Sequence, residues 1–436
     1  MNFSTEAKQT IRTILKKEIN RWVEEEELTK IEEVENGVRE LCQMLGGLIM
    51  QTVLEAVDEE IEGEVTCDCD GAAKRIMGRE ATIITVFGKV KYKRSYYECE
   101  NCGEKWHELD RKMGISAGQV TPVLGKLLTI AGIEAAFEQA VKMVEAMLLI
   151  EISDNTIRKE TQEAGEKQRE REEAWVEESH DEDWLQKRER TKKTSPERLY
   201  GSIDGAHVPI GDEWRELKTL CWYRVGEIYG EKRPKAQGIT YHTDIKPAQE
   251  FGKLLWATGV RRLADKAKEL VFVCDGAAWI WKLVSHYFPK AVQIVDWYHA
   301  CEYLTPIADA VFETQDQRRA WMEKQKTWLW EGKIRQVIQA CSEYFDHPDA
   351  AQAAHRAATY YTNNQHRMDY PTYRKKGYRI GSGTIESACK QIASARLKIA
   401  GARWTLQGAI TTAKARAAWL SDDDSFDRIT SLPLAA

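Results

Sequence analysis

The sequence predicts an α/β protein in which a mixed sheet forms the last large unit, with smaller helical and cysteine-containing parts before it. Three observations support this fold class. Apolar residues recur at helical spacing through residues 1–62. Two cysteine pairs flank a β-prone segment in residues 63–112. From residue 197 onward, three β-prone runs follow one another and then alternate with helical patterns, which favours a mixed sheet over a doubly wound nucleotide-binding fold.

The composition is that of an ordinary soluble protein. The 436 residues are 43% hydrophobic and 30% charged, and a chain of this length is expected to form more than one domain. No apolar stretch approaches membrane-spanning length, and the first residues lack the apolar core of a signal peptide. We therefore expect a cytoplasmic protein. The net charge of −6 argues against a uniformly basic nucleic-acid binder but allows local basic surfaces.

Four cysteines in residues 63–112 form a zinc-ribbon-like pattern. Cys67 and Cys69 precede the β-prone segment, and Cys99 and Cys102 follow it. In a reducing compartment cysteines are free thiols or metal ligands, and four thiolates around a pair of strands suit one structural Zn²⁺. The first pair has one intervening residue, where two are more usual. Unpaired buried thiols are the alternative. His107 is either a substitute ligand or an ordinary surface residue.

Residues 113–165 predict a helix-turn-helix. Ser153 is a good N-cap for a helix that begins at the next residue, and a helical pattern with an apolar face precedes it. In a helix-turn-helix the second helix enters the major groove, so that Thr156, Arg158 and Lys159 would face DNA. An ordinary helical hairpin fits the same spacing. Residues 166–196 are strongly charged and predict a solvated helix or a linker.

Residues 197–420 predict the sheet-based unit, and residues 421–436 a carboxyl-terminal tail. Strands are expected at residues 198–210, 216–225, 236–243, 270–275 and 292–296, with helices at 248–257 and 277–287. An all-helical insertion occupies residues 300–375, and a further helix follows Gly381 and runs to about Ile399. The insertion thus separates the last helix from the strands that precede it.

Three acidic residues stand at the ends of elements in this unit. Asp204 and Asp275 each end or interrupt a β-prone run and precede a glycine, and Glu386 lies in the first turns of the last helix. Each aspartate alone could cap a strand or helix. Together, carboxylates at close range repel one another unless cations bind them. Hard oxygen ligands suit Mg²⁺, and two such ions roughly 3.5–4 Å apart can activate a nucleophile and stabilise a leaving oxygen at a phosphodiester.

Several motifs along the chain resemble one family. Taken with the cysteine pairs, the helix from Ser153 and Asp204-Gly-Ala, three further motifs in this order look like a bacterial insertion-sequence DDE transposase of the ISKra type, related to Mutator-like transposases. These motifs are Cys-Asp-Gly-Ala-Ala-Trp-Ile-Trp ending at Trp281, Asp296-Trp-Tyr-His-Ala, and Tyr-Arg-Ile-Gly-Ser-Gly-Thr-Ile-Glu-Ser-Ala-Cys-Lys ending at Lys390.

The resemblance implies a ribonuclease-H-like catalytic domain whose acidic triad is Asp204, Asp275 and Glu386, binding two catalytic Mg²⁺ ions. It also implies that His299, in Asp296-x-x-His299, is an accessory residue at or near the active site. A hydrogen-bonded histidine at a strand-to-helix turn is the alternative for His299.

Phosphate contacts are expected at basic residues around the last helix, since a chain of negative net charge must hold DNA through patches. The candidates are Arg374, Lys375, Lys376, Arg379, Lys390, Arg396 and Arg403, with a further basic run at residues 187–193. Exposed cations balanced by acids elsewhere are the alternative. Four tryptophans could stack on an unpaired base, although helix core is the more common role: Trp321, Trp328, Trp330 and Trp404.

The leading hypothesis is a DNA transposase that binds the terminal inverted repeats of its insertion sequence and performs Mg²⁺-dependent strand cleavage and strand transfer. Its partners would be double-stranded DNA, at transposon ends and target, and at least one further copy of the chain, because two ends must be brought together. Such an enzyme would be nucleoid-associated. One rival is a catalytically silent DNA-binding regulator that uses only the ribbon and helix-turn-helix. Another is a ribonuclease-H-like nuclease without transposition.

Overall fold

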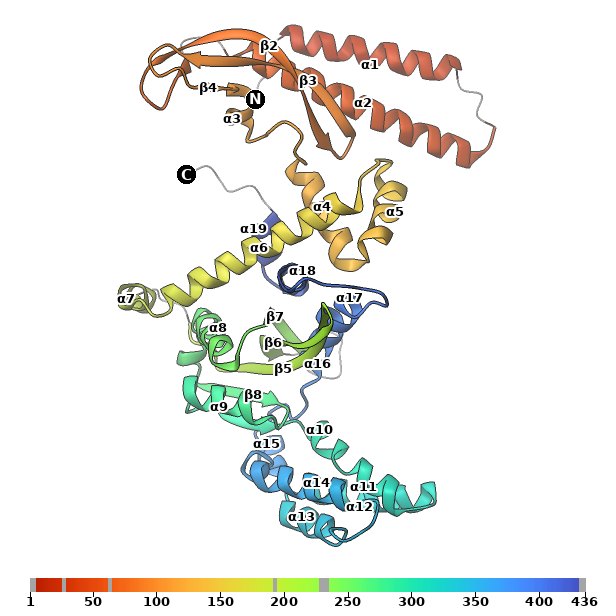
Figure 1. Ribbon diagram of the computed structural model, residues 1–436, viewed down its shortest axis with the longest axis vertical. Helices are drawn as coiled ribbons and strands as arrows, with labels where there is room; N and C mark the ends of the chain where they lie inside the picture. The colour runs from red at the N-terminus through yellow and green to blue at the C-terminus, as the bar shows by residue number, and fades with distance from the viewer. Residues whose placement is uncertain (1–4, 26–28, 62–64, 191–193, 227–234, 431–436) are drawn as a thin grey trace. The chain divides into compact units, whose positions relative to one another are not determined.

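The computed structural model describes residues 5–25, 29–61, 65–190, 194–226 and 235–430. The chain divides into two compact units, Met1–Thr161 with Thr430–Ala436, and Gln162–Ile429. Figure 1 labels their helices and strands. Each unit is described by itself below.

The first unit contains two long helices, a four-stranded sheet and a group of shorter helices. The sheet order is β1-β2-β3-β4, with every neighbouring pair antiparallel. The helices and strands of this part are α1 (Thr5–Glu25), α2 (Ile31–Glu59), β1 (Val65–Thr66), β2 (Ala72–Thr85), β3 (Gly88–Cys99), β4 (Lys105–Trp106), α3 (Glu108–Met113), α4 (Pro122–Glu134) and α5 (Phe137–Leu148).

The hairpin of β2 and β3 carries the cysteines at its far end from the turn. Thr85 pairs with Gly88, which leaves two residues in the turn, and Gly88 has a φ of +84° that a side chain disfavours. The two strands pack against α2 and α3 through one apolar core that includes Leu54, Val57, Ile83, Tyr92, Tyr97 and Leu109. Predicted helices over residues 1–62 and predicted strands around the turn are both found within the described residues.

A second apolar core joins α4, α5 and the start of α6 (Asp154–Glu178). Ile157 on α6 is fully buried against Leu124 and Leu128 of α4 and Ala140 and Val144 of α5. The predicted N-cap is present: the Thr156 N–H donates to Ser153 Oγ at 3.1 Å. The apolar pattern that predicted two helices around a turn therefore places three helices around one small core.

The second unit is built on a five-stranded mixed sheet of order β7-β6-β5-β8-β9. β5, β6 and β7 are antiparallel neighbours, whereas β8 and β9 run parallel to β5. The strands are β5 (Arg198–Ile210), β6 (Glu213–Gly226), β7 (Lys235–Asp244), β8 (Glu269–Cys274) and β9 (Val292–Val295). The predicted mixed α/β sheet is confirmed, and all five strands start within three residues of the predicted positions.

Helices cover both faces of this sheet. Trp222 on β6 donates its indole N–H to Thr258 on α8 (Ala248–Arg261) at 2.9 Å. Thr219, which points to the opposite face because side chains alternate along a strand, interacts with Cys389 on α16 (Gly383–Cys389). The remaining elements on the sheet are η1 (Ala264–Lys266), α9 (Ala278–Tyr287), α17 (Ala395–Leu397), α18 (Leu406–Leu420) and α19 (Ser425–Thr430).

The helix that carries Glu386 differs from the prediction. It does not continue as a regular α-helix to Ile399: a π-helical segment, η3 (Lys390–Ser394), separates α16 from α17. The segment packs against α16, α17 and α18, with Ile392 and Ala393 buried. Sequence periodicity alone does not distinguish a π turn within a helix, because one wide turn changes the apolar spacing by a single residue.

The insertion between β9 and α16 is helical, as predicted. It comprises α10 (Trp297–Glu302), α11 (Thr305–Val311), α12 (Gln315–Trp330), α13 (Ile334–Ser342), α14 (Ala351–Asn364), η2 (Gln365–Arg367) and α15 (Tyr370–Lys375). Tyr361 on α14 donates to the Ala300 carbonyl at 2.5 Å, and Tyr370 donates to the Val295 carbonyl at 3.1 Å. The Tyr361 bond joins two helices of the insertion, and the Tyr370 bond fixes the insertion against the end of β9.

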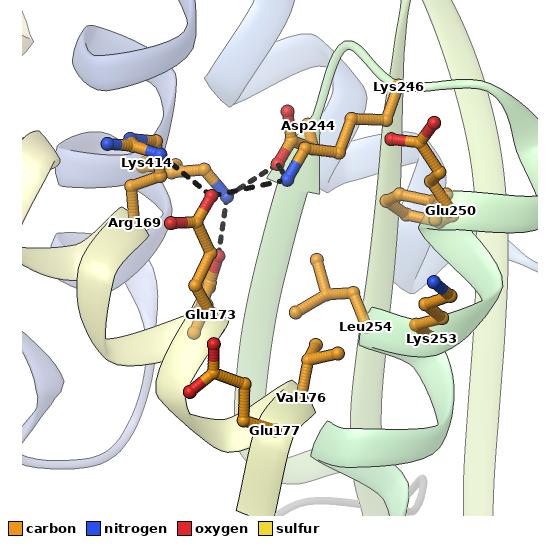
Figure 2. A pocket seen from close by; sticks show the side chains of 12 residues that line it. Arg169, Glu173, Val176, Glu177, Asp244, Lys246, Glu250, Lys253, Leu254 and Lys414 are labelled. Carbon is orange, nitrogen blue, oxygen red and sulfur yellow. Dashed lines mark hydrogen bonds and ion pairs between the residues drawn. The ribbon is translucent and has the colours of Figure 1, made fainter.

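The strongly charged segment of residues 166–196 is only partly solvated, which corrects the predicted solvated helix or linker. Its described part forms the rest of α6 and α7 (Glu182–Arg190). Glu172 is 3% exposed and pairs with the buried Lys414, which also lies 3.1 Å from Asp244 Oδ2 (Figure 2). Mutual neutralisation lets these charges be buried, so the charged composition does not keep this face in water.

No helix in the described part of the chain is long and apolar enough to cross a membrane.

Candidate functional site

Asp204 and Asp275 lie at the same level on neighbouring parallel strands. β5 pairs with β8 so that Gly201 stands beside Phe272, and the same register three positions further on places Asp204 beside Asp275. Each carboxylate accepts a hydrogen bond from the backbone N–H of the glycine that follows it. Asp275 follows the end of β8, as predicted, whereas Asp204 lies in the middle of β5, because β5 continues to Ile210 beside β6. The two aspartates lie near each other beyond the point where the pairing of β5 with β8 ends.

The space beside the glycine after each aspartate is narrow, most firmly at Gly276, where a Cβ would meet an aromatic ring rather than the movable end of a side chain. A Cβ at Gly205 would lie 2.3 Å from Glu216 Oε1, and one at Gly276 would lie 2.2 Å from the ring of Tyr360. Both distances are far below van der Waals contact. The Asp-Gly pairs seen in the sequence thus reflect close approach of neighbouring side chains to the backbone beside the acids.

Asp296 extends the row to a third strand. Cys274 pairs with Val295 in the parallel β8–β9 register, so Asp275 and Asp296 are also level. Asp296 is fully buried and caps α10: its Oδ1 accepts the His299 N–H at 2.6 Å, and its Oδ2 accepts the Ser382 N–H. Burial raises the pKa of Asp296 against these hydrogen bonds. Asp296 therefore ties the end of β9 to the residues that precede α16.

Glu386 reaches the same edge from α16, which packs against β5 and β6. Its Oε1 accepts a hydrogen bond from Ser382 Oγ at 2.8 Å. Ser382 is buried, and its own N–H is held by Asp296. The chain Asp296–Ser382–Glu386 orients the glutamate. Sequence analysis did not single out Ser382, although its spacing of four residues before Glu386 on a helix start was a usable signal.

His299 stands among these acids. Its Nε2 lies 3.8 Å from Glu386 Oε1, and its Nδ1 lies 3.3 Å from Glu302 Oε2. Burial alone would lower the pKa of His299, but the surrounding carboxylates, Asp296 and Asp275 first, raise it above its ordinary value. A protonated His299 thus supplies part of the positive charge that the acids lack.

Asp204 is half-buried and poorly compensated. Burial raises its pKa, and the negative charge of Asp275 adds to that rise, against hydrogen bonds from Gly205 and Cys389 and the charge of His299. A carboxylate with a raised pKa beside other carboxylates is typical of a functional site, where a bound cation would restore the ionised form.

One group at this edge brings at least three donor atoms within 4.8 Å of one another, among the residues that the structure describes. It consists of Asp296, His299 and Glu386. The donor atoms of the predicted combination, Asp204, Asp275 and Glu386, do not all lie within this distance of one another. The charges of Asp275 and Glu386 nonetheless both raise the pKa of His299. The donor chemistry, mostly carboxylate oxygen, suits Mg²⁺.

Four of the five cysteines of the first unit, Cys67, Cys69, Cys99 and Cys102, form the other close group, again with all donor atoms within 4.8 Å. Cys67 Sγ lies 3.6 Å from Cys102 Sγ, and Cys69 Sγ lies 3.5 Å from Cys99 Sγ. Zinc–sulfur bonds of about 2.3 Å in a tetrahedron place sulfurs about 3.8 Å apart, so the residues fit Zn²⁺. The Cys102 N–H, followed by that of Asn101, lowers the pKa of Cys99 to about 6, which favours a thiolate.

The unusual spacing of the first cysteine pair is accommodated by a tight turn. Asp70 has a φ of +62°, its N–H donates to the Cys67 carbonyl at 2.9 Å, and Gly71 leaves the sulfurs room, since a Cβ there would lie 2.9 Å from Cys99 Sγ. His107 is not part of the cluster: its Nδ1 is 3.0 Å from the Ser95 carbonyl oxygen.

The residues predicted to face DNA on α6 are differently placed. Arg158 and Lys159 are exposed, whereas Thr156 is half-buried and its Oγ1 lies 2.8 Å from Ser153 Oγ. Arg158 bonds to Asn155. Two of the three side chains therefore lie on the surface of the first helical turns.

Among the predicted phosphate-binding residues, Arg396 is buried and does not present its side chain to solvent, so its prediction as a phosphate contact is wrong. Its side chain is 2% exposed and its guanidinium lies over the ring of Trp404, 4.9 Å from the centroid. The others are exposed or, for Arg379, half-buried: Arg374, Lys375, Lys376, Lys390 and Arg403. Residues 191–193 of the second basic run lie outside the described residues. Sequence pattern gives charge but does not tell which face of a helix an arginine occupies.

Of the four tryptophans predicted as stacking candidates, Trp404 is buried, Trp321 and Trp328 are half-buried, and Trp330 is exposed. Trp404 is 7% exposed and donates to the Leu397 carbonyl at 3.0 Å, and Trp321 packs between Phe312 and Tyr344. Trp330 is 40% exposed, yet Arg374 covers its ring at 3.8 Å. Trp328 is half-buried, with Lys324 over its ring at 4.7 Å. These contacts agree with the ordinary packing role.

Two segments of the chain match families of known proteins. Residues 24–215 match an uncharacterised protein family (UPF0236), and residues 249–400 match a family described as Transposase. The second match supports the predicted resemblance to insertion-sequence DDE transposases. The segment that matches the Transposase family contains Asp275, Asp296, His299 and Glu386, whereas Asp204 lies in the segment shared with the uncharacterised family.

Comparison of solved structures adds no independent argument to that match. The Drosophila P element transposase strand transfer complex matches at 10% identity and a TM-score of 0.23, covering 70% of this chain and 81% of that chain. A TM-score this low does not establish that the two proteins share a fold. No curated protein matches the chain.

Proposed function

We propose that the protein is a DNA transposase that binds the terminal inverted repeats of its insertion sequence and performs Mg²⁺-dependent strand cleavage and strand transfer. The observation that carries the proposal is the row of in-register aspartates, with Glu386 reaching the same edge from α16. The sheet order, three antiparallel strands followed by two parallel ones, supports a ribonuclease-H-like catalytic domain.

Asp204, Asp275 and Glu386 would hold the metal ions. When bound, Mg²⁺ supplies Lewis-acid activation of a hydroxyl or water and stabilisation of the leaving oxygen. The protein's own residues orient and balance the charge. Ser382 donates to Glu386, and Asp296 holds the Ser382 N–H. The raised pKa of His299 keeps a cation beside the acids, which reduces their mutual repulsion before the ions bind.

A cleavage assay tests this proposal. Full-length protein and the single variants Asp204→Asn, Asp275→Asn and Glu386→Gln are incubated with Mg²⁺ and DNA carrying the inverted repeats that flank the gene, and cut positions are mapped. Each variant is expected to lose cleavage and joining. Asp212→Asn is the matched control, because Asp212 is an exposed carboxylate in the turn after β5. Activity in all three variants equal to that of the control would overturn the assignment.

The same assay separates the rival functions. A catalytically silent regulator would bind the repeats without nicking them. One observation favours this rival: the metal-ligating atoms that lie closest together belong to Asp296, His299 and Glu386 and not to the predicted triad. Cleaved ends without products joined to target DNA would indicate a nuclease. Measuring the mass of the protein bound to end DNA tests the expected pairing of at least two copies.

We further propose that the four cysteines bind one structural Zn²⁺ that holds the DNA-recognising unit together. The expected result of zinc removal by a chelator is loss of amide hydrogen-exchange protection in β2 and β3, with β5 to β9 unchanged. Cys99→Ser should reproduce the loss, whereas Cys42→Ser should not, because Cys42 lies outside the cluster. Stoichiometric zinc in wild type but also in Cys99→Ser and Cys69→Ser would contradict this assignment.

A further inference from the structure

A pocket lies directly beside the acidic edge, between the sheet and the helical insertion. Its volume is about 480 Å³, and its lining begins at Gly276, the residue after Asp275. α9 forms one side through Trp281 and Lys282, and α14 forms the other through Arg356 and neighbouring residues. A volume in the range of about 300–1,000 Å³ is typical of sites that take a small ligand or one unit of a polymer.

The charge of this pocket is entirely positive. Lys282, Arg356 and Arg367 line it, and no Asp or Glu does. None of the three forms an ion pair within the described residues: Lys282 and Arg356 are exposed, and Arg367 is half-buried. Two half-buried arginines elsewhere are paired. Arg188 pairs with Asp265, and Arg198 with Glu269. Three cations without carboxylate partners, in a chain of net charge −6, mark a site for an anion.

Aromatic rings and amides hold two of these cations in place. Arg367 lies over Trp281, 4.8 Å from the centroid, and donates to Gln293 Oε1 at 2.7 Å. Arg356 lies over Tyr303 at 5.3 Å, and Tyr303 also stacks on Tyr360 at 3.7 Å. The pocket therefore presents guanidinium groups held by neighbouring rings, and such groups suit phosphate oxygens.

The position of the pocket narrows the ligand further. It adjoins Asp275 through Gly276, so a phosphate bound there would lie next to a phosphodiester held at the acidic edge. A recess of about 480 Å³ has the size of a site for one small ligand, which suits one unit of a strand rather than a whole duplex. We propose that this pocket binds the backbone phosphates of a single-stranded DNA segment that leaves the acidic edge. This inference rests on the proposed transposase function.

Binding to single-stranded DNA tests this directly. Full-length wild type and the double variant Lys282→Gln/Arg356→Gln are titrated with a fluorescent single-stranded oligonucleotide of the transposon end, without Mg²⁺, over a series of salt concentrations. Both side chains are exposed, so the fold should tolerate the change. The control Lys290→Gln/Arg335→Gln removes the same charge from exposed positions outside the pocket.

The expected result is weaker binding by the pocket variant and a salt slope smaller by about 1.4, since each lost single-strand phosphate contact contributes about 0.7. The control should match wild type. Equal loss in the pocket variant and the control would overturn the proposal, and so would loss for duplex DNA as large as that for the single strand. If wild-type protein does not cleave end DNA but the pocket variant still binds the single strand more weakly than the control, the proposed transposase function is refuted. The proposed phosphate-binding role of the pocket is then retained.

Discussion

Two clusters of acids in the second unit differ in how their charge is compensated. Glu172 and Asp244 are 3% exposed and share Lys414, whose Nζ lies 3.1 Å from Asp244 Oδ2 (Figure 2). Lys414 also donates to the Thr243 carbonyl at 2.8 Å. At the acidic edge, the positive charge of His299 acts on Asp204. The first cluster is a closed ion-pair network that joins α6 and α18 to β7. The second has unmet negative charge, which is the property of a site prepared for a cation.

The pKa values of the two clusters shift in opposite directions. Burial would raise the pKa of Glu172, yet Lys414 and then His242 lower it to about 2. Burial raises the pKa of Asp204, and nothing comparable opposes it. Burial therefore acts alike on both acids, and the partner decides the outcome. A buried acid is informative about function only once its partner is known.

The largest expected effect comes from neutralising the acidic edge. Asp275→Asn should reduce strand cleavage by more than about 100-fold, because even groups around a metal's direct ligands contribute about 10–100-fold. Its unfolding temperature should stay equal to that of wild type or rise, since a repelling charge is removed. Parallel cleavage assays and thermal melts check this. A variant that melts well below wild type would show that Asp275 stabilises the fold.

Removing Lys414 from the ion-pair network with Glu172 and Asp244 should lower the stability of the fold. Lys414→Met removes the buried cation that Glu172 and Asp244 share, leaving His242 beside Glu172 and the half-buried Lys246 beside Asp244, and breaking a buried pair costs about 3–5 kcal/mol. Urea unfolding followed by tryptophan fluorescence measures the loss. Lys398→Met is the control, since Lys398 is exposed. Equal stability of the two variants would mean that water or a conformational change compensates the acids.

A smaller effect on cleavage is expected from changing Asp296, which holds the residues before α16 at the acidic edge. Asp296→Asn replaces one acceptor oxygen with an amide that cannot accept from Ser382 or His299, and an unsatisfied buried donor costs about 1–3 kcal/mol. Because Ser382 orients Glu386, cleavage should fall more than DNA binding does. Comparing kcat with the affinity for end DNA distinguishes this positioning role from general destabilisation, which would lower both through the folded fraction.

The smallest effect is a pH dependence. Glu172 has a folded pKa of about 2, below its ordinary 4.5, so its stabilising contribution is present above pH 4.5 and is lost as the pH falls towards 2. The free energy of unfolding, measured across this range, should fall with pH in wild type. Lys414→Met should lose the Glu172 contribution to this slope, whereas Asp204→Asn should keep it. An identical slope in Lys414→Met would place its origin in other carboxyl groups.

Much of the second unit could be predicted from local patterns. Strands that alternate or run apolar, and turns rich in glycine, set the positions of β5 to β9, because these signals are local. Asp204 and Asp275 stood out because a carboxylate at the end of an apolar run conflicts with burial. Their register could not be predicted, since it depends on pairing between segments about seventy residues apart.

Other parts of the site depend on contacts that no local pattern carries. Lys414 and Glu172 neutralise each other from residues far apart in the chain, so the charged helix looked solvated. Arg396 looked like a phosphate contact because its burial depends on the π turn before it. Asp296 was seen only within a motif, because its role lies in the N–H groups it accepts from two separate segments.

The π-helical segment Lys390–Ser394 has a consequence for sequence comparison. A π turn holds one residue more than an α turn, so it is the structural form of a single-residue insertion in a helix. Relatives with an uninterrupted helix there would need a one-residue gap in the alignment after Glu386. Without that gap, every later position, including Arg396 and the buried Lys414, would be compared with the wrong neighbour and would look variable where it is shared.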